Sequence, residues 1–281
     1  MNKRIANSNG IERIDSQKHP IIQILRDIQT EKGRDEHGAF HVEGSMVVRR
    51  ALEYGGRALF ILVTDKFASS TESKDIIEAA KAAGVDVFEV TEGLLTKILP
   101  AKPSPGVIAC VERRLYEPAN LLEGENSLLI LIDRCENPDN LGMLLRSLDA
   151  AGVDGVAITS DSVDPFSRLS VRASRGSVLS LKLSIVSNPE EWLVAAQQKG
   201  FKVSASSTHG AVNVWTVDLK GPTIIVVGNE HTGVRQSIRD LADSFVFIPM
   251  AGKMESLNIA VAGAILAYEA VRQRWEVMSD E

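Results

Sequence analysis

The second half of the chain alternates strand-sized apolar runs with longer helical patterns, and this alternation constrains the fold more than any other feature. The runs are rich in valine, isoleucine and leucine, which predicts strands buried on both faces of a parallel sheet with helices on each side. The expected strands are 128–133, 155–159, 181–186, 201–205, 223–228 and 244–248, and the expected helices are 140–151, 190–199, 234–242 and 257–275. Such sheets bind ligands in the loops at the carboxyl ends of their strands.

The first half has the pattern of a smaller α/β domain. Helical spacing of apolar residues appears over 21–28, around 46–54 and over 73–83, and β-rich runs lie at 59–63, 85–90 and 107–111. A segment rich in Pro, Gly, Asn and Glu, typical of a linker, separates the halves. The sequence therefore predicts a first domain over 1–115, a linker over 116–127 and a second domain over 128–281.

Charge and cysteine content exclude several classes of protein. The formal net charge is −6, with +1 over residues 1–115 and −7 over 116–281, which excludes a protein that coats nucleic acid by bulk positive charge. Cys110 and Cys135 are the only cysteines, so a disulfide framework and a multi-cysteine zinc site are excluded and a cytoplasmic setting is expected. No apolar segment has the length of a signal peptide core or a membrane span, so no membrane association is expected.

Familiar catalytic and phosphate-binding motifs are absent. The chain has no GxxxxGK[ST], no GxGxxG after a strand, no HExxH and no GxSxG, which argues against P-loop, dinucleotide, zinc-hydrolase and serine-hydrolase chemistry. Its five histidines lack metal-ligand spacing, and no metal is expected.

Three polar loops follow predicted strands of the second half. Loop 133–149 contains Asn140 and Arg146, loop 228–234 contains Glu230 between two glycines, and loop 248–258 ends in Ser256 and Asn258. Taken one at a time, each has an ordinary structural explanation: Asn140 and Ser256 as helix N-caps, and the glycines as turn formers. Arg146 stands among Met and Leu neighbours, where a guanidinium is expected to hold an anionic partner.

Together, these loops resemble a known family. NPDNLGMLLR (137–146), VVGNEHTGV (226–234) and IPMAGKMESLNIAVAGAILAYEA (248–270) are similar, in order and spacing, to the three signature motifs of the SpoU branch of the SPOUT RNA methyltransferases. Residues 19–55 resemble the ribosomal-protein-like substrate domain that many of these enzymes carry ahead of the catalytic domain.

The resemblance implies transfer of a methyl group from S-adenosylmethionine to a ribose 2′-hydroxyl of structured RNA, with ribosomal RNA favoured. It also implies a deep trefoil knot in the α/β catalytic domain and a homodimer. By motif position, the expected cofactor-binding residues are Gly228, Ile248 and Leu257, with Thr208 as a further candidate. The expected catalytic residues are Asn140, Arg146, Glu230, Ser256 and Asn258.

The chemistry suggests a role for each catalytic residue. A guanidinium stays protonated in proteins, so Arg146 is better suited to gripping an RNA phosphate than to acting as a general base. Glu230 is expected to pair with Arg146, and the two asparagines and Ser256 are expected to orient arginine, ribose and cofactor.

Because the catalytic half is acidic, most RNA contacts are expected in the first domain. The expected contacts are the basic residues near the N-terminus together with three arginines of the second half: Lys18, Arg26, Lys32, Arg34, Arg49, Arg50, Arg168, Arg172 and Arg175. Three alternatives remain open: the same chemistry on transfer RNA, an inactive RNA-binding protein of this fold, and an unrelated nucleotide-dependent enzyme.

Overall fold

The computed structural model describes residues 11–53, 57–100, 104–124, 126–207 and 212–279, with side chains as far as Trp275. The chain divides into two compact units. The N-terminal unit comprises residues up to Arg114 together with Phe166–Leu179, and the C-terminal unit comprises Leu115–Pro165 and the residues from Ser180 onward. Residues 166–179, which are sequentially inside the second half, thus pack with the first.

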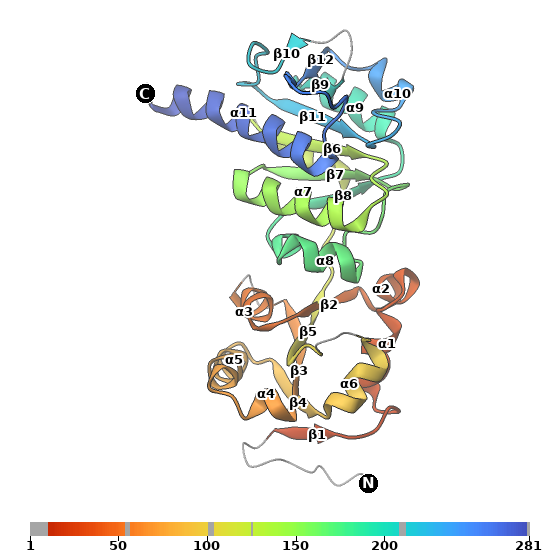
Figure 1. Ribbon diagram of the computed structural model, residues 1–281, viewed down its shortest axis with the longest axis vertical. Coiled ribbons are helices and arrows are strands. Elements are labelled where there is room, and N and C mark those ends of the chain that lie inside the picture. The colour runs from red at the N-terminus through yellow and green to blue at the C-terminus, as the bar shows by residue number, and fades with distance from the viewer. Residues whose placement is uncertain (1–10, 54–56, 101–103, 125, 208–211, 280–281) are drawn as a thin grey trace. The chain divides into compact units, whose positions relative to one another are not determined.

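The N-terminal unit is built on a five-stranded mixed sheet in the order β1-β4-β3-β5-β2 (Figure 1). β1, β4 and β3 are parallel, and β5 is antiparallel to both β3 and β2. Its elements are β1 (Glu12–Ile14), α1 (Pro20–Asp27), α2 (Glu31–His37), β2 (Ala39–Glu43), α3 (Ser45–Glu53), β3 (Ala58–Thr64), α4 (Asp65–Ala68), α5 (Thr71–Ala82), β4 (Asp86–Val90), α6 (Glu92–Ile98), β5 (Val107–Glu112), α8 (Arg168–Ser174) and the 3-10 turn η2 (Ser177–Leu179).

Residues at the N-terminus of α1 fix where this helix begins, and its apolar face packs into the core. Pro20 occupies the first helical position, and the His19 ring accepts a hydrogen bond from the Ile21 amide at 3.3 Å. Ile22 and Leu25 of α1 are buried with residues of α6 and of the sheet. Helix and sheet thus share one apolar layer.

The C-terminal unit has seven strands, all parallel, in the order β10-β12-β9-β11-β6-β7-β8 (Figure 1). Its elements are the 3-10 turn η1 (Pro118–Glu123), β6 (Leu128–Asp133), α7 (Pro138–Ala151), β7 (Gly155–Thr159), β8 (Leu183–Val186), α9 (Pro189–Gln198), β9 (Lys202–Ser206), β10 (Val212–Asn213), β11 (Thr223–Gly228), α10 (Gln236–Arg239), β12 (Ser244–Phe247) and α11 (Ile259–Ser279).

Helices cover both faces of this sheet. Residues of α9 and α10 share a buried apolar cluster with alternate residues of the central strands, among them Leu129 and Leu131. On α11, a Cβ added at Gly263 would lie 2.6 Å from Leu144 of α7, so this glycine allows the two helices to pack closely within the chain. β11 and β6 end together, with Gly228 paired to Asp133, and their loops therefore start side by side.

The structure confirms the expected α/β class: a parallel sheet with helices in the second half and a smaller α/β domain in the first. Strands 128–133, 155–159 and 223–228 have the predicted bounds. The expected helix 234–242 is reduced to the four residues of α10. The elements that were not predicted are α2, α4, α6, α8, β1, β2 and β10. The trefoil knot stays a prediction. In the described part of the chain, no helix has the length and apolarity needed to cross a bilayer.

Candidate active site

A cavity of about 660 Å³ opens at the carboxyl ends of β9, β11 and β12, within the size range of small-molecule binding sites. Five residues that the sequence singled out line it: Gly228, Glu230, Ile248, Ser256 and Leu257. Thr208 lies outside the described residues, and its neighbours Ser206 and Ser207 line the cavity.

The loop after β11 folds back tightly against its own start. A Cβ on Gly228 would lie 2.3 Å from the backbone nitrogen of Val234 and 2.4 Å from the carbonyl carbon of Gly233, so a side chain at position 228 does not fit. Gly233 has a φ of 67°, a conformation that glycine adopts readily. Contact distance therefore requires glycine at position 228, and the positive φ favours it at position 233.

Buried Asn229 holds the same loop in shape. Its Oδ1 accepts hydrogen bonds from the amides of His231 at 2.8 Å and Thr232 at 3.1 Å, and its Nδ2 donates to the carbonyl of Arg134 at 3.0 Å. Asn229 is only 3% exposed, so it is a structural residue of the site that the sequence analysis did not single out.

Three predicted catalytic residues, one from each polar loop, form a hydrogen-bonded cluster. Asn140 Nδ2 donates to Glu230 Oε1 at 2.5 Å, and Asn258 Nδ2 donates to Asn140 Oδ1 at 2.9 Å. Asn258 Oδ1 also accepts from the Ala260 amide at 2.8 Å, which ties the cluster to the start of α11. Because Glu230 lines the cavity as well, the cluster and the cavity share one carboxylate.

Two capping assignments are corrected by this geometry. Asn258, not Ser256, caps α11, and Ser256 is exposed at the cavity wall. At α7 the cap is Asn137, whose Oδ1 accepts from the amides of Asp139 and Asn140. The Asn140 side chain is therefore not used for capping and is available to the cluster.

Arg146 lies outside the cluster. It is six residues beyond Asn140 on α7, which places it about 120° around the helix axis and about 9 Å along it. Arg146 is exposed and forms no ion pair with Glu230 or any other described residue, contrary to the expected pairing. Its leucine neighbours in sequence, Leu144 and Leu145, point to the core, whereas Arg146 and Met143 face solvent.

A partly buried ion pair that the sequence analysis missed joins the strand-end loops. Asp133, fully buried at the end of β6, accepts hydrogen bonds from the Arg235 amide at 2.8 Å and from its Nε at 2.6 Å. Arg235 also contacts both carboxylate oxygens of Asp161 at 2.8 Å. The only sequence signal for this link was an acidic residue ending an apolar strand.

The cysteine nearest the cluster is unreactive. Burial raises the pKa of the Cys135 thiol to about 12, with the negative charge of Glu230 as a smaller cause. The thiol is therefore protonated near neutral pH and unsuited to nucleophilic attack. Among the described residues, no three His, Cys, Asp or Glu side chains are grouped as ligands for a metal ion.

Comparison with known proteins decides the family. The model of the SpoU rRNA Methylase family matches residues 127–268, which include the cavity and the cluster. The chain belongs to the SpoU rRNA methylase family. The model of the MRM3-like substrate binding domain matches residues 19–109, within the N-terminal unit.

Relatives of this SpoU chain are similar over nearly its whole length. A 23S rRNA (uridine(2479)-2'-O)-methyltransferase of Streptomyces viridochromogenes is 32% identical, over 86% of this chain and 85% of the relative. The 23S rRNA (guanosine-2'-O-)-methyltransferase RlmB of Ralstonia nicotianae is 31% identical, over 82% of this chain and 94% of the relative.

Solved structures agree with these sequence relatives. A crystal structure of an AdoMet-bound rRNA methyltransferase from Sinorhizobium meliloti has a TM-score of 0.82 and 29% identity, over 93% of this chain and 98% of that chain. The SpoU methyltransferase AviRb from Streptomyces viridochromogenes, in complex with the cofactor AdoMet, has a TM-score of 0.79 and 30% identity, over 90% of this chain and 98% of that chain.

Proposed function

We propose that this protein transfers a methyl group from S-adenosylmethionine to a ribose 2′-hydroxyl of ribosomal RNA. The observation that carries the proposal is the cluster of Asn140, Glu230 and Asn258 at the edge of the strand-end cavity, in a chain of the SpoU family. Relatives named as 23S rRNA 2′-O-methyltransferases and two AdoMet-bound structures support the same conclusion.

The cavity fits the cofactor in size and in the character of its lining. Gly228 lines the cavity where the loop after β11 folds back on itself, and Ile248 and Leu257 add apolar wall. These three residues would hold the nucleoside, with Ser256 and Glu230 as polar groups beside it. When bound, S-adenosylmethionine supplies an electrophilic methyl group on a sulfonium.

The cluster can orient the ribose and receive its proton. Asn140 is fixed by one hydrogen bond to Glu230 and one from Asn258, so its remaining N–H and oxygen lone pair have defined directions. Glu230 uses Oε1 for Asn140, which leaves Oε2 to accept a hydrogen bond from a hydroxyl in the cavity. In this account Glu230 polarises the ribose hydroxyl, and the asparagines hold the carboxylate in place.

Arg146 is proposed to bind the RNA phosphate beside the target ribose. It has no ion pair in the described part of the chain, and a guanidinium binds a phosphate by two parallel hydrogen bonds. An Arg146→Lys variant keeps the charge and loses the planar fork. We expect its kcat/KM to fall by at least tenfold, and near-normal turnover would contradict a role that depends on the fork.

A homodimer is proposed as the active form. Val261, Tyr268 and Trp275 recur every seven residues on α11 and are 48%, 50% and 71% exposed, with Met143 of α7 also exposed. An apolar stripe of this spacing on a helix is typical of a packing surface, whereas Gly263 of the same helix packs against α7 within the chain. Arg146 shares the exposed face of α7 with Met143. A second copy of the chain that packs against Met143 would therefore lie beside this arginine.

The test is transfer of labelled methyl from S-adenosylmethionine to unmodified RNA. We expect label in a 23S rRNA transcript and none in a transfer RNA pool. Label confined to transfer RNA would contradict the assigned substrate. Cofactor binding without any transfer would support the alternative of an inactive RNA-binding protein.

A further inference from the structure

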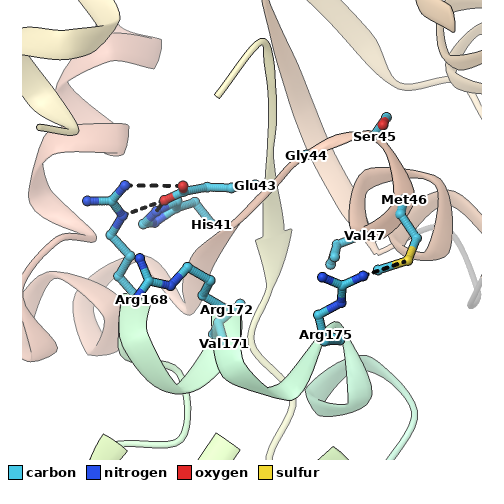
Figure 2. Close-up of a pocket in the computed structure, with 10 residues that line it drawn as sticks. All are labelled: His41, Glu43, Gly44, Ser45, Met46, Val47, Arg168, Val171, Arg172 and Arg175. Atoms are coloured by element: carbon cyan, nitrogen blue, oxygen red, sulfur yellow. Dashed lines mark hydrogen bonds and ion pairs between the residues drawn. The ribbon is translucent and has the colours of Figure 1, made fainter. Parts of the chain in front are cut away.

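A second cavity, of about 240 Å³, lies within the N-terminal unit, and no step of the proposed methyl transfer uses it. Its walls are the end of β2, the start of α3 and one side of α8. Figure 2 shows Arg168 pointing toward Glu43 at the end of β2 and Arg175 toward Met46 at the start of α3, with Arg172 between them on α8. The lining residues used below are Glu43, Ser45, Met46, Arg168, Arg172 and Arg175.

One of the three arginines is already neutralised. Arg168 donates from Nε to one carboxylate oxygen of Glu43 at 2.5 Å and from Nη2 to the other at 3.1 Å. Buried His41 also contacts Glu43, at 3.1 Å. Burial alone would raise the pKa of Glu43, but the hydrogen bonds from His41 and Arg168 outweigh it and lower that pKa to about 2. Arg168 and Glu43 therefore form a fixed ion pair that anchors α8 to β2.

The other two arginines have no counter-ion among the described residues. In the part of the chain that the structure describes, no carboxylate lies within ion-pair distance of Arg172 or Arg175. Both are exposed, and Arg175 contacts only a weak acceptor, the Met46 sulfur, at 3.8 Å. Two positive charges thus border a cavity whose one carboxylate is already paired.

Arg175 ends α8 in a backbone conformation that favours glycine. Arg175 has a φ of 55°, the left-handed conformation that favours glycine, and it ends α8 with its amide bonded to the Arg172 carbonyl. Its own carbonyl accepts from Arg50 Nη1 at 3.0 Å, a bond that any residue would make. Glycine at this position would keep both the turn and this backbone contact.

The remaining wall of the cavity also favours an anion. Ser45 and Met46 begin α3, a nine-residue helix, and both line the cavity. The positive end of the helix dipole therefore adds to the field of the two free guanidiniums. Guanidiniums with no carboxylate partner at a cavity suit the planar, bidentate recognition of phosphate.

We propose that this cavity seats a backbone phosphodiester of the RNA substrate, bound by Arg172 and Arg175. Arg168 is a positioning residue, because its ion pair with Glu43 holds α8 in place. The proposal rests on the proposed function, since it takes RNA as the substrate. It names a segment from the second half of the sequence as part of the RNA-binding surface of the N-terminal unit.

The experiment measures affinity of the full chain for an unmodified 23S rRNA transcript between about 50 and 200 mM salt. Arg172→Gln and Arg175→Gly are each expected to weaken binding about five- to tenfold and to reduce the slope of log K against log salt by about 1. The KM for RNA should rise with kcat unchanged, and affinity for S-adenosylmethionine should stay the same. Arg175→Gly should melt no lower than the wild type, which separates loss of binding from loss of folding.

Lys66→Gln is the matched control, because it removes one positive charge from α4, at the far end of the same unit from α8 (Figure 1). It should change neither affinity nor slope. Unaltered affinity in both arginine variants, with an active wild type, would overturn the proposal and leave the proposed function intact. A wild type that neither binds nor methylates RNA would overturn both. If inorganic phosphate stabilises the wild type but not the arginine variants, and their RNA affinity is unchanged, the cavity is a free-phosphate site.

Discussion

At the scale of single residues, the site depends on a few positions where no other side chain serves. A side chain at position 228 would clash with the loop backbone, and buried Asn229 makes three hydrogen bonds that hold the loop. Asn140 donates one hydrogen bond to Glu230 and accepts one from Asn258. Each requirement is geometric and can be tested by one substitution.

Gly228→Ala places a methyl group 2.3 Å from the Val234 nitrogen, which is backbone and cannot swing aside. We expect a loss of about 1–3 kcal/mol of stability and at least a tenfold loss of affinity for S-adenosylmethionine. Calorimetric titration and thermal unfolding measure the two effects. Gly221→Ala, where an added Cβ meets nothing within 4 Å, should change neither. Equal cofactor affinity in both variants would show that the close approach at Gly228 is unimportant.

Asn140→Asp replaces the donor to Glu230 with a carboxylate at the same place. Two carboxylates at this distance share one proton, and that proton restores the donor. Activity of the variant should therefore be best at low pH and fall as rising pH removes the shared proton, whereas Asn140→Ala should lose on the order of 100-fold in kcat without such a trend. The pH profiles of kcat for the two variants measure this difference. A flat profile for Asn140→Asp would mean that the hydrogen bond to Glu230 does not matter for turnover.

Secondary structure could be predicted where burial is uniform. The strands β6 and β11 were predicted because almost every one of their side chains is apolar. The helices α7 and α11 were predicted because their apolar stripes are long. β2 was missed because it holds His41 and Glu43, whose burial depends on partners distant in sequence.

α8 was missed for the same reason, since its arginines pair with or face the first half of the chain. The candidate site shows a similar limit. Motif order identified the loops, but only coordinates show that Asn140 contacts Glu230 and Arg146 does not. Arg34, expected to contact RNA, is buried and donates to the Ile28 carbonyl.

The anchoring of α8 has a pH signature at the scale of elements. Because the pKa of Glu43 is lowered to about 2 from the usual 4.5, its stabilisation is complete above about pH 4.5 and is lost as pH falls toward 2. This difference corresponds to at most about 3 kcal/mol. Glu43→Gln should therefore be less stable than the wild type at pH 6, and the gap should narrow at pH 3.

Urea unfolding followed by circular dichroism measures this gap. Glu78→Gln, at an exposed position on α5, is the control and should match the wild type throughout. A gap for Glu43→Gln that is the same at both pH values would contradict the assigned ion pair.

At the scale of the whole molecule, the charge of −6 no longer argues against RNA. Acidic residues are used structurally, as Asp133 holds Arg235 and Glu43 holds Arg168, while Arg146, Arg172 and Arg175 are exposed without carboxylate partners among the described residues. Net charge counts these groups equally, and only the structure separates paired from available charges.

The proposed dimer predicts that one charge on the exposed stripe of α11 separates the subunits. Tyr268→Glu should shift the mass measured by light scattering from dimer to monomer and reduce methyl transfer at least tenfold. Val194→Glu, at a similarly exposed position on α9, should remain a dimer with normal activity. A wild type that is monomeric at micromolar concentration and fully active would contradict the dimer.

The cluster at the strand-end cavity is proposed to perform methyl transfer to a ribose hydroxyl. The most direct measurement is nucleotide-resolution mapping of methylation in a 23S rRNA transcript incubated with S-adenosylmethionine and either the wild type or Asn140→Ala. We expect a ribose 2′-O-methyl group at a defined position with the wild type and a loss of on the order of 100-fold in its rate of formation with the variant. Methylation on a base, or equal ribose methylation by both proteins, would contradict it.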